Sequence, residues 1–278
     1  MHPARLLWSI LEPLHAVMYF GADVRAAGKS IGLRGYWDTY FAFRAAPLGE
    51  VGAAAVVGMF AGFEPGMVGR SLPSAWSRAS AQTCLATRAA VSAEALRAVG
   101  VSDEVCASAV SLLAPLVLEP TGRPLGAANA ALPLPEDPVA AVWQLATTVR
   151  EHRGDGHVAA LVTAGLSGLD ALHLQMVAKG LVPEVLRQAR GWSPEQWAAG
   201  RESLAERELL DADGLTMTGA DVLESVEELT DAAAWQDGLD SVPVDEVAEV
   251  LMPAAVAVWE SGLLPEGNPI GVPRPASS

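Results

Sequence analysis

The chain has 278 residues, of which 51% are hydrophobic and 18% are charged, a balance typical of a folded globular protein and not of a disordered one. Its 18 Lys and Arg residues are outnumbered by 33 Asp and Glu residues, which gives a net charge of −15. A surface of that sign repels phosphate backbones and anionic lipid headgroups, so nucleic acid and membrane are disfavoured as partners.

The N-terminal segment 6–20 is apolar but contains Glu12 and His15, and it lacks the basic start and cleavage site of a signal peptide. With only two cysteines in the chain, this predicts a cytoplasmic protein. Glu12, His15 and Tyr19 are spaced three and four apart and therefore share one helix face. They form a first candidate catalytic group, and a structural histidine in the core is the alternative for His15.

Aromatic residues are concentrated in the segment 36–43, with Arg44 directly after it. Aromatic rings bury much area at little entropic cost, and this surplus has no counterpart in the second half of the chain. Core packing is the alternative explanation. The ligand-binding residues that we predict are Tyr36, Trp37, Tyr40, Phe41, Arg44 and, from the second half, His173.

Six prolines from residue 115 to residue 138 indicate a linker. We therefore expect a first unit over 1–120, a linker over 121–135, a second unit over 136–265 and a flexible tail over 266–278.

The segment 151–157 holds two imidazoles and two carboxylates, and His152, Asp155 and His157 form a second candidate acid–base group. The alternative is structural: Gly154 and Gly156 would break one helix, and Asp155 would cap the next. The spacing matches no known metal motif, so no metal is predicted, and no cofactor can be named.

The two halves share landmarks in the same order, which predicts an internal duplication. Gly32-Leu-Arg-Gly35 corresponds to Gly165-Leu-Ser-Gly168, and each is followed by a helical run of similar length. Trp8 and Trp143 each open an apolar helical segment. Most of the chain has apolar residues three and four apart, which predicts helices.

One segment departs from this helical pattern, because the helix expected over 195–208 is followed by Asp213-Gly214, a sequence typical of a tight hairpin turn. Leu215, Thr216 and Gly219 then begin another helix. The stretch resembles the wing of MarR-type regulators. The whole chain also resembles an actinobacterial family of duplicated MarR-like proteins, through residues 12–20 and 150–161.

These resemblances imply a mainly α fold of two tandem winged-helix-like units, a MarR-like pseudo-dimer with short β-hairpin wings. The actinobacterial family implies no particular activity.

Charge argues against DNA binding by such wings. Residues 184–230 contain four arginines and eleven carboxylates, and the wing 210–218 has no positive residue. Lys and Arg supply most of a protein's affinity for DNA phosphates, so the excess of carboxylates on this surface would repel the DNA backbone.

The interface between two such units is a usual place for a ligand pocket. We therefore expect a protein of bacterial specialised metabolism or self-resistance that binds a small organic ligand. A DNA-binding MarR-like transcriptional regulator is the alternative. Whether the site is catalytic, and whether the protein is a monomeric pseudo-dimer or a homodimer, is left open by the sequence.

Overall fold

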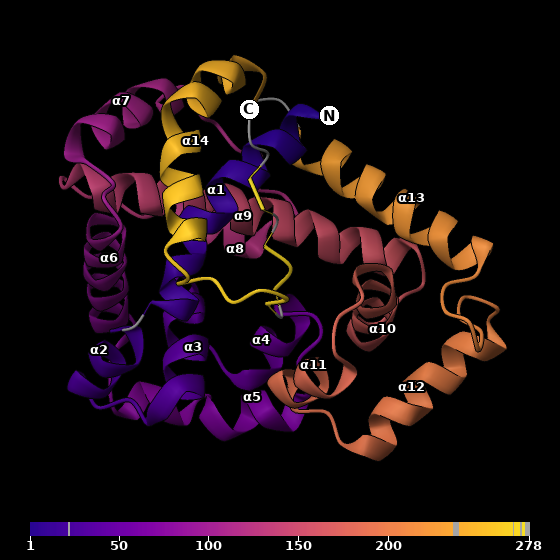
Figure 1. Ribbon diagram of the computed structural model, residues 1–278. Coiled ribbons are helices and arrows are strands. Elements are labelled where there is room, and N and C mark those ends of the chain that lie inside the picture. The colour runs from indigo at the N-terminus through magenta and orange to yellow at the C-terminus, as the bar shows by residue number, and fades with distance from the viewer. Residues whose placement is uncertain (22, 236–238, 269, 273, 276–278) are drawn as a thin grey trace.

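The computed structural model describes residues 1–278 except 22, 236–238, 269, 273 and 276–278, and its regular elements are all helices (Figure 1). The first part of the chain forms α1 (Pro3–Phe20), α2 (Val24–Ser30), α3 (Gly35–Ala45), η1 (Ala46–Leu48), α4 (Ala53–Met59), α5 (Pro65–Ser71), η2 (Ser74–Ser77), α6 (Ala81–Ala98), α7 (Asp103–Leu113) and α8 (Pro124–Ala130). The remainder forms α9 (Pro138–Thr163), α10 (Gly168–Lys179), α11 (Pro183–Arg190), α12 (Pro194–Glu206), α13 (Met217–Ala234), η3 (Leu239–Ser241) and α14 (Val244–Glu260).

The centre of the molecule is α9, a helix of 26 residues. It begins sharply because the Asp137 carboxylate accepts the backbone N–H groups of Val139 and Ala140, and because proline is well tolerated at the first helical position. Helices α1, α6, α7, α8 and α13 all pack against it. Many of its residues are therefore buried, including the polar ones in its second half.

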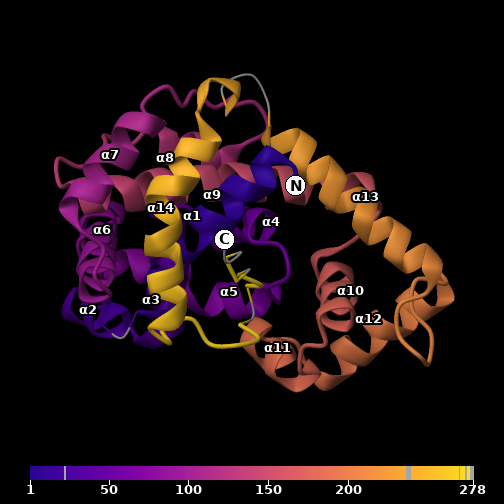
Figure 2. The same cartoon turned by 45° about the horizontal axis from the view of Figure 1, so that its top comes forward.

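The largest hydrophobic core combines α1, α3, α6, α7 and the first half of α9 with the C-terminal helix α14. Figures 1 and 2 show α14 lying along α1, although almost the whole chain separates them in sequence. Leu264 and Val272, which follow α14, are also buried in this core. The predicted linker contains α8, which packs on α9. The division into units at 120 and 136 remains a prediction.

A smaller core lies where the end of α9 meets α10, α12 and α13. It contains Leu161, Leu174, Leu204 and Val226. Two of these helices begin with reciprocal caps: in α10 the Ser167 hydroxyl and the Asp170 carboxylate each accept a backbone N–H from the other residue, and α12 begins in the same way.

The β-hairpin wing is the main error in the expected fold. The described residues contain no strand, and the segment between α12 and α13 is reduced to one antiparallel bridge between Leu210 and Leu215. The Asp211 carboxylate turns the chain tightly by accepting the N–H groups of Asp213 and Gly214. Thr216 then caps α13 directly. The two sides of this turn pair at a single bridge and form no strand. The winged-helix assignment is therefore wrong.

The expected break at Gly154 and Gly156 is also absent, because α9 continues through both residues. A Cβ at Gly156 would overlap the Arg123 guanidinium. Asp155 does not cap a new helix, and its carboxylate instead accepts the backbone N–H of Gly126 in α8 at 2.8 Å. The glycine at 156 therefore serves close packing on a continuous helix.

Within the described ranges, no single helix is both long and apolar enough to cross a membrane.

Candidate functional site

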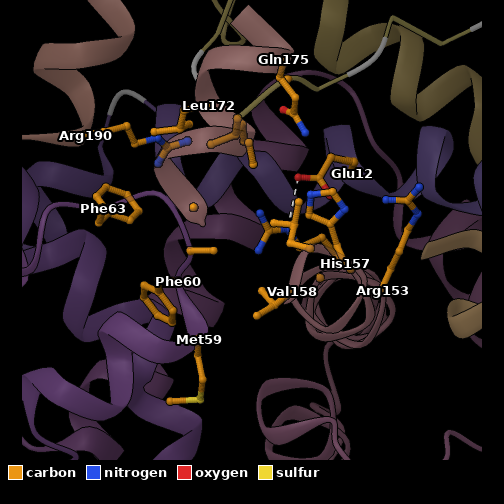
Figure 3. A pocket seen from close by; sticks show the side chains of 18 of the residues that line it. Glu12, Met59, Phe60, Phe63, Arg153, His157, Val158, Leu172, Gln175 and Arg190 are labelled. Atoms are coloured by element: carbon orange, nitrogen blue, oxygen red, sulfur yellow. Dashed lines mark hydrogen bonds and ion pairs between the residues drawn. The ribbon is translucent and has the colours of Figure 1, made fainter. Parts of the chain in front are cut away.

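A cavity of about 190 Å³ lies where α9 and α10 face α3, α4 and the segment after α4. The end of the chain also contributes to it through Ile270 and Gly271. Figure 3 shows Phe60 and Phe63 on one side and His157 and Arg153 of α9 on the other. The cavity is therefore built by residues from both ends of the sequence and from its middle.

One wall of the cavity is aromatic. Phe60 and Phe63 follow α4 and are joined by Tyr40 of α3, whose ring centroid is 5.4 Å from that of Phe63. The Arg44 guanidinium carbon lies 3.9 Å from the centroid of the Phe60 ring, and that of Arg190 lies 4.5 Å from the centroid of Phe63. These stacked cations fix the rings while leaving apolar surface towards the cavity.

The other walls are rich in positive charge. The lining includes five cationic side chains but two carboxylates, although the whole chain is strongly acidic. The five cations are Arg44, Arg150, Arg153, Lys179 and Arg190, and the two carboxylates are Glu12 and Glu227.

A buried carboxylate behind the lining holds two of these arginines. Glu151 is 1% exposed and accepts hydrogen bonds from Arg44 Nε at 2.7 Å and Arg44 Nη2 at 2.9 Å. Arg150 Nη1 binds the same carboxylate at 2.9 Å. Burial alone would raise the pKa of Glu151, but these two guanidinium groups hold it well below its usual value. This charged network therefore stays ionised and fixes the arginines in place.

Glu12, predicted to act with His15, belongs to this network. Its carboxylate accepts hydrogen bonds from Trp8 Nε1 at 2.9 Å and from Arg150 Nε at 3.3 Å. It does line the cavity. His15, in contrast, does not, because it points into the main core.

The tautomer of His15 follows from its neighbours. The Thr147 hydroxyl donates to the Trp143 carbonyl at 2.8 Å, so it must accept from His15 Nδ1–H at 2.9 Å. His15 Nε2 then accepts from the Tyr19 hydroxyl, also at 2.9 Å. Burial lowers the pKa of His15 well below its usual value. The predicted contact between His15 and Tyr19 exists, but both nitrogens are used within the core.

His157 has the same arrangement with one difference. The Thr230 hydroxyl donates to the Val226 carbonyl at 2.6 Å and so accepts from His157 Nδ1–H at 3.0 Å. No described residue is bonded to Nε2, and this side chain lines the cavity (Figure 3). Burial lowers the pKa of His157, which keeps the imidazole neutral at pH 7. Its Nε2 lone pair is therefore a hydrogen-bond and proton acceptor facing the cavity.

The rest of the second candidate group lies elsewhere. His152 is 1% exposed, packs against Gly126 and makes no hydrogen bond to the described residues. Burial lowers its pKa to about 4, and burial raises the pKa of Asp155 to about 6. Neither residue lines the cavity that contains His157.

The predicted ligand-binding residues are also divided. Tyr40 and Arg44 line the cavity, whereas Tyr36, Trp37 and Phe41 pack in the aromatic cluster behind Tyr40. His173 lies outside the cavity, where its Nε2 is 3.0 Å from the Trp197 carbonyl oxygen.

Several lining residues were not predicted from the sequence. On α9 these are Arg150 and Arg153, which share a face with the predicted His157 because the three residues are three and four apart. Phe63, Lys179 and Arg190 carry no local signal of this kind, and their convergence arises from the packing of α5, α10 and α11. No group of three or more His, Cys, Asp or Glu side chains suited to a metal occurs within the part of the chain that the structure describes.

A family model described as a helix-turn-helix family matches residues 4–265, which is nearly the whole chain. The chain belongs to this helix-turn-helix family. Searches of curated proteins and of solved structures return no match. The family assignment agrees with the helical fold, and it names neither a ligand nor a reaction.

Proposed function

We propose that this helix-turn-helix family member binds a small organic molecule with an apolar or aromatic part in the cavity between α9, α10 and the Phe60–Phe63 wall. The observation that carries the proposal is the pairing of an aromatic wall with an outward-facing imidazole nitrogen in one cavity. A concave site that combines aromatic side chains with polar groups in fixed positions is typical of ligand binding.

In this proposal, the aromatic wall binds the body of the ligand and His157 Nε2 accepts a hydrogen bond from a hydroxyl or N–H group on it. A neutral imidazole held by a threonine would also accept a proton from such a group, as a general base does. Turnover would then depend on His157, whereas His15 would contribute only to stability.

The first test uses N-phenyl-1-naphthylamine, an uncharged aromatic molecule whose fluorescence rises in apolar sites. We expect saturable binding with one molecule per chain. Gln175 lines the cavity from α10, so Gln175→Phe should fill it and weaken binding about tenfold, equivalent to about 1.4 kcal/mol.

The matched control is Gln82→Phe on the exposed face of α6. It should bind the dye as the parent protein does. Equal affinity of the Gln175→Phe and parent proteins, or fluorescence that never saturates, would refute a site in this cavity.

Membership of the helix-turn-helix family favours a second candidate, a DNA-binding transcriptional regulator. The excess of carboxylates over arginines in residues 184–230 opposes it. A gel-shift titration against genomic fragments at low and moderate salt separates the two. Tight, salt-sensitive retention would establish DNA binding, and its absence at both salt concentrations is the result that we expect.

A further inference from the structure

A second cavity, of about 380 Å³, adjoins the one that contains His157. Five residues line both cavities, and all are apolar or glycine. They are Ala61, Phe63, Val158, Leu161 and Gly168. The rest of the second lining is almost entirely apolar and includes Val57, Pro65, Leu166 and Trp192. In contrast to the first, the described residues that line it include no charged side chain.

Helix α9 runs past both cavities and changes character along the way. Arg150, Arg153 and His157 line the first cavity, Val158 and Leu161 line both, and Val162 lines the second alone. At 1.5 Å per residue, the distance from Arg150 to Val162 is about 18 Å. One helix therefore places polar, ion-paired side chains at one end of the combined site and hydrocarbon at the other.

The arginines on α9 at the first end are already paired with carboxylates. Arg150 binds Glu12 and Glu151, and Arg153 binds Glu227 and Asp231. Lys179 differs from them, because it forms no ion pair with the described residues and lies against Gly271 at the cavity edge. The carboxylate that acts on it from a distance belongs to Glu227, which is already bound to Arg153 at 2.9 Å. An anionic group is the ligand chemistry that complements such a surface.

We propose that the ligand is an apolar carboxylic acid, with its carboxylate near Lys179 and its hydrocarbon chain continuing past Val158 and Leu161 into the second cavity. The hydroxyl or N–H group that binds His157 is then a second polar group on the same molecule. This inference rests on the proposed function, because it names the class of molecule that the same site takes. The inference goes beyond the proposed function because it assigns the ligand a head group, an orientation along α9 and a second cavity for its hydrocarbon chain.

The test of the head group compares decanoate with decan-1-ol, which have chains of equal length, as competitors of N-phenyl-1-naphthylamine. We expect decanoate to bind about tenfold more tightly. Lys179→Gln should remove most of that difference while leaving decan-1-ol binding unchanged. The matched control is Lys29→Gln, at the chain's other lysine, which is exposed on α2. Equal affinities of the acid and the alcohol for the parent protein would overturn the anionic head group.

The test of the second compartment uses Gly58, which lines it from α4 and whose added Cβ would meet no atom within 4 Å. Gly58→Leu should weaken decanoate binding about tenfold and leave butanoate binding unchanged, because only the longer chain reaches this space. Gly69 on α5 has the same open surroundings and lines neither cavity, so Gly69→Leu is the control.

Failure of the second compartment and failure of the proposed function give different results. If the dye binds but Gly58→Leu affects decanoate and butanoate equally, the second compartment is wrong and the proposed function stands. If neither the dye nor any competitor binds the parent protein, the proposed function itself fails.

Discussion

At the scale of single residues, threonine hydroxyls fix the tautomers of His15 and His157. Thr147 and Thr230 both donate to a carbonyl four residues earlier and therefore force the neighbouring imidazole to place its proton on Nδ1. In His15 the remaining nitrogen accepts from Tyr19, whereas in His157 it faces the cavity. Identical local chemistry thus yields a core residue in one place and a candidate site residue in the other.

His152 presents a third situation, because neither ring nitrogen has a hydrogen-bond partner among the described residues. Its pKa in the folded state is about 4, below the ordinary value of 6.5. Stabilisation from the neutral form is therefore complete above about pH 6.5 and is lost as the pH falls towards 4. Asp155, with its pKa raised to about 6, has the opposite effect as the pH falls.

We predict that His152→Leu removes the first of these two contributions. Relative to the parent protein, the unfolding free energy of the variant should rise by about 2 kcal/mol between pH 7 and pH 4.5, because one pKa unit corresponds to about 1.4 kcal/mol. Urea denaturation at both pH values measures the difference. A constant difference across this range would show that His152 does not stay neutral in the fold.

At the scale of elements, close backbone approaches hold the cavity walls together. The first residue of α10, Gly168, lies so near the backbone of Ala61 and Gly62 that a Cβ would overlap it. This contact joins the segment after α4 to α10 directly beside both cavities. The close contact between α10 and the segment after α4 therefore requires glycine at position 168.

Gly168→Ala should destabilise the protein by about 1–3 kcal/mol, since the added methyl forces α10 away from Gly62. Helix propensity alone predicts the reverse sign, because alanine is favoured over glycine within helices by about 1 kcal/mol. Gly69→Ala in α5, where nothing lies within 4 Å of the new Cβ, should show that stabilising effect. Thermal or urea denaturation of the pair compares them, and stabilisation by both would contradict the close contact.

At the scale of the whole molecule, helices from the two ends of the sequence pack against each other. Helix α14 returns to α1 (Figure 2). Farther along the chain, Ile270 and Gly271 form part of the cavity lining. Leu264 and Val272 anchor this segment in the main core with 4% and 5% of their surfaces exposed. Ile270 and Gly271, which fall in the predicted tail, thus line the candidate site.

Removal of residues 263–278 should lower stability by about 3–6 kcal/mol, because burial of a Leu or Val side chain contributes about 1.5–3 kcal/mol. It should also weaken dye binding. The milder Ile270→Ser separates these effects: it should reduce affinity while changing the melting temperature little. Exposed Val182 provides the control substitution Val182→Ser. Unchanged affinity in Ile270→Ser would exclude this segment from the site.

Some of these features were predictable from the sequence because they depend on local spacing. The helical periodicity, the contact between His15 and Tyr19, and the common face of Arg150, Arg153 and His157 all follow from residues three and four apart. The hairpin prediction failed because turn residues indicate a reversal and not the length of its arms. Between α12 and α13 only Leu210 and Leu215 pair, because the Asp211 turn lies directly between them and Thr216 already caps α13.

The sequence by itself determined a helical, acidic protein of a helix-turn-helix family with polar groups on α1 and α9. Only the tertiary structure decided which of them face a cavity, because partners distant in sequence set that choice. Thr230 leaves the outer nitrogen of His157 available, whereas Tyr19 occupies that of His15. The aromatic wall and the cations meet for the same reason: α3, α9, α10 and α11 bury their apolar faces together, which brings their remaining side chains to one cavity.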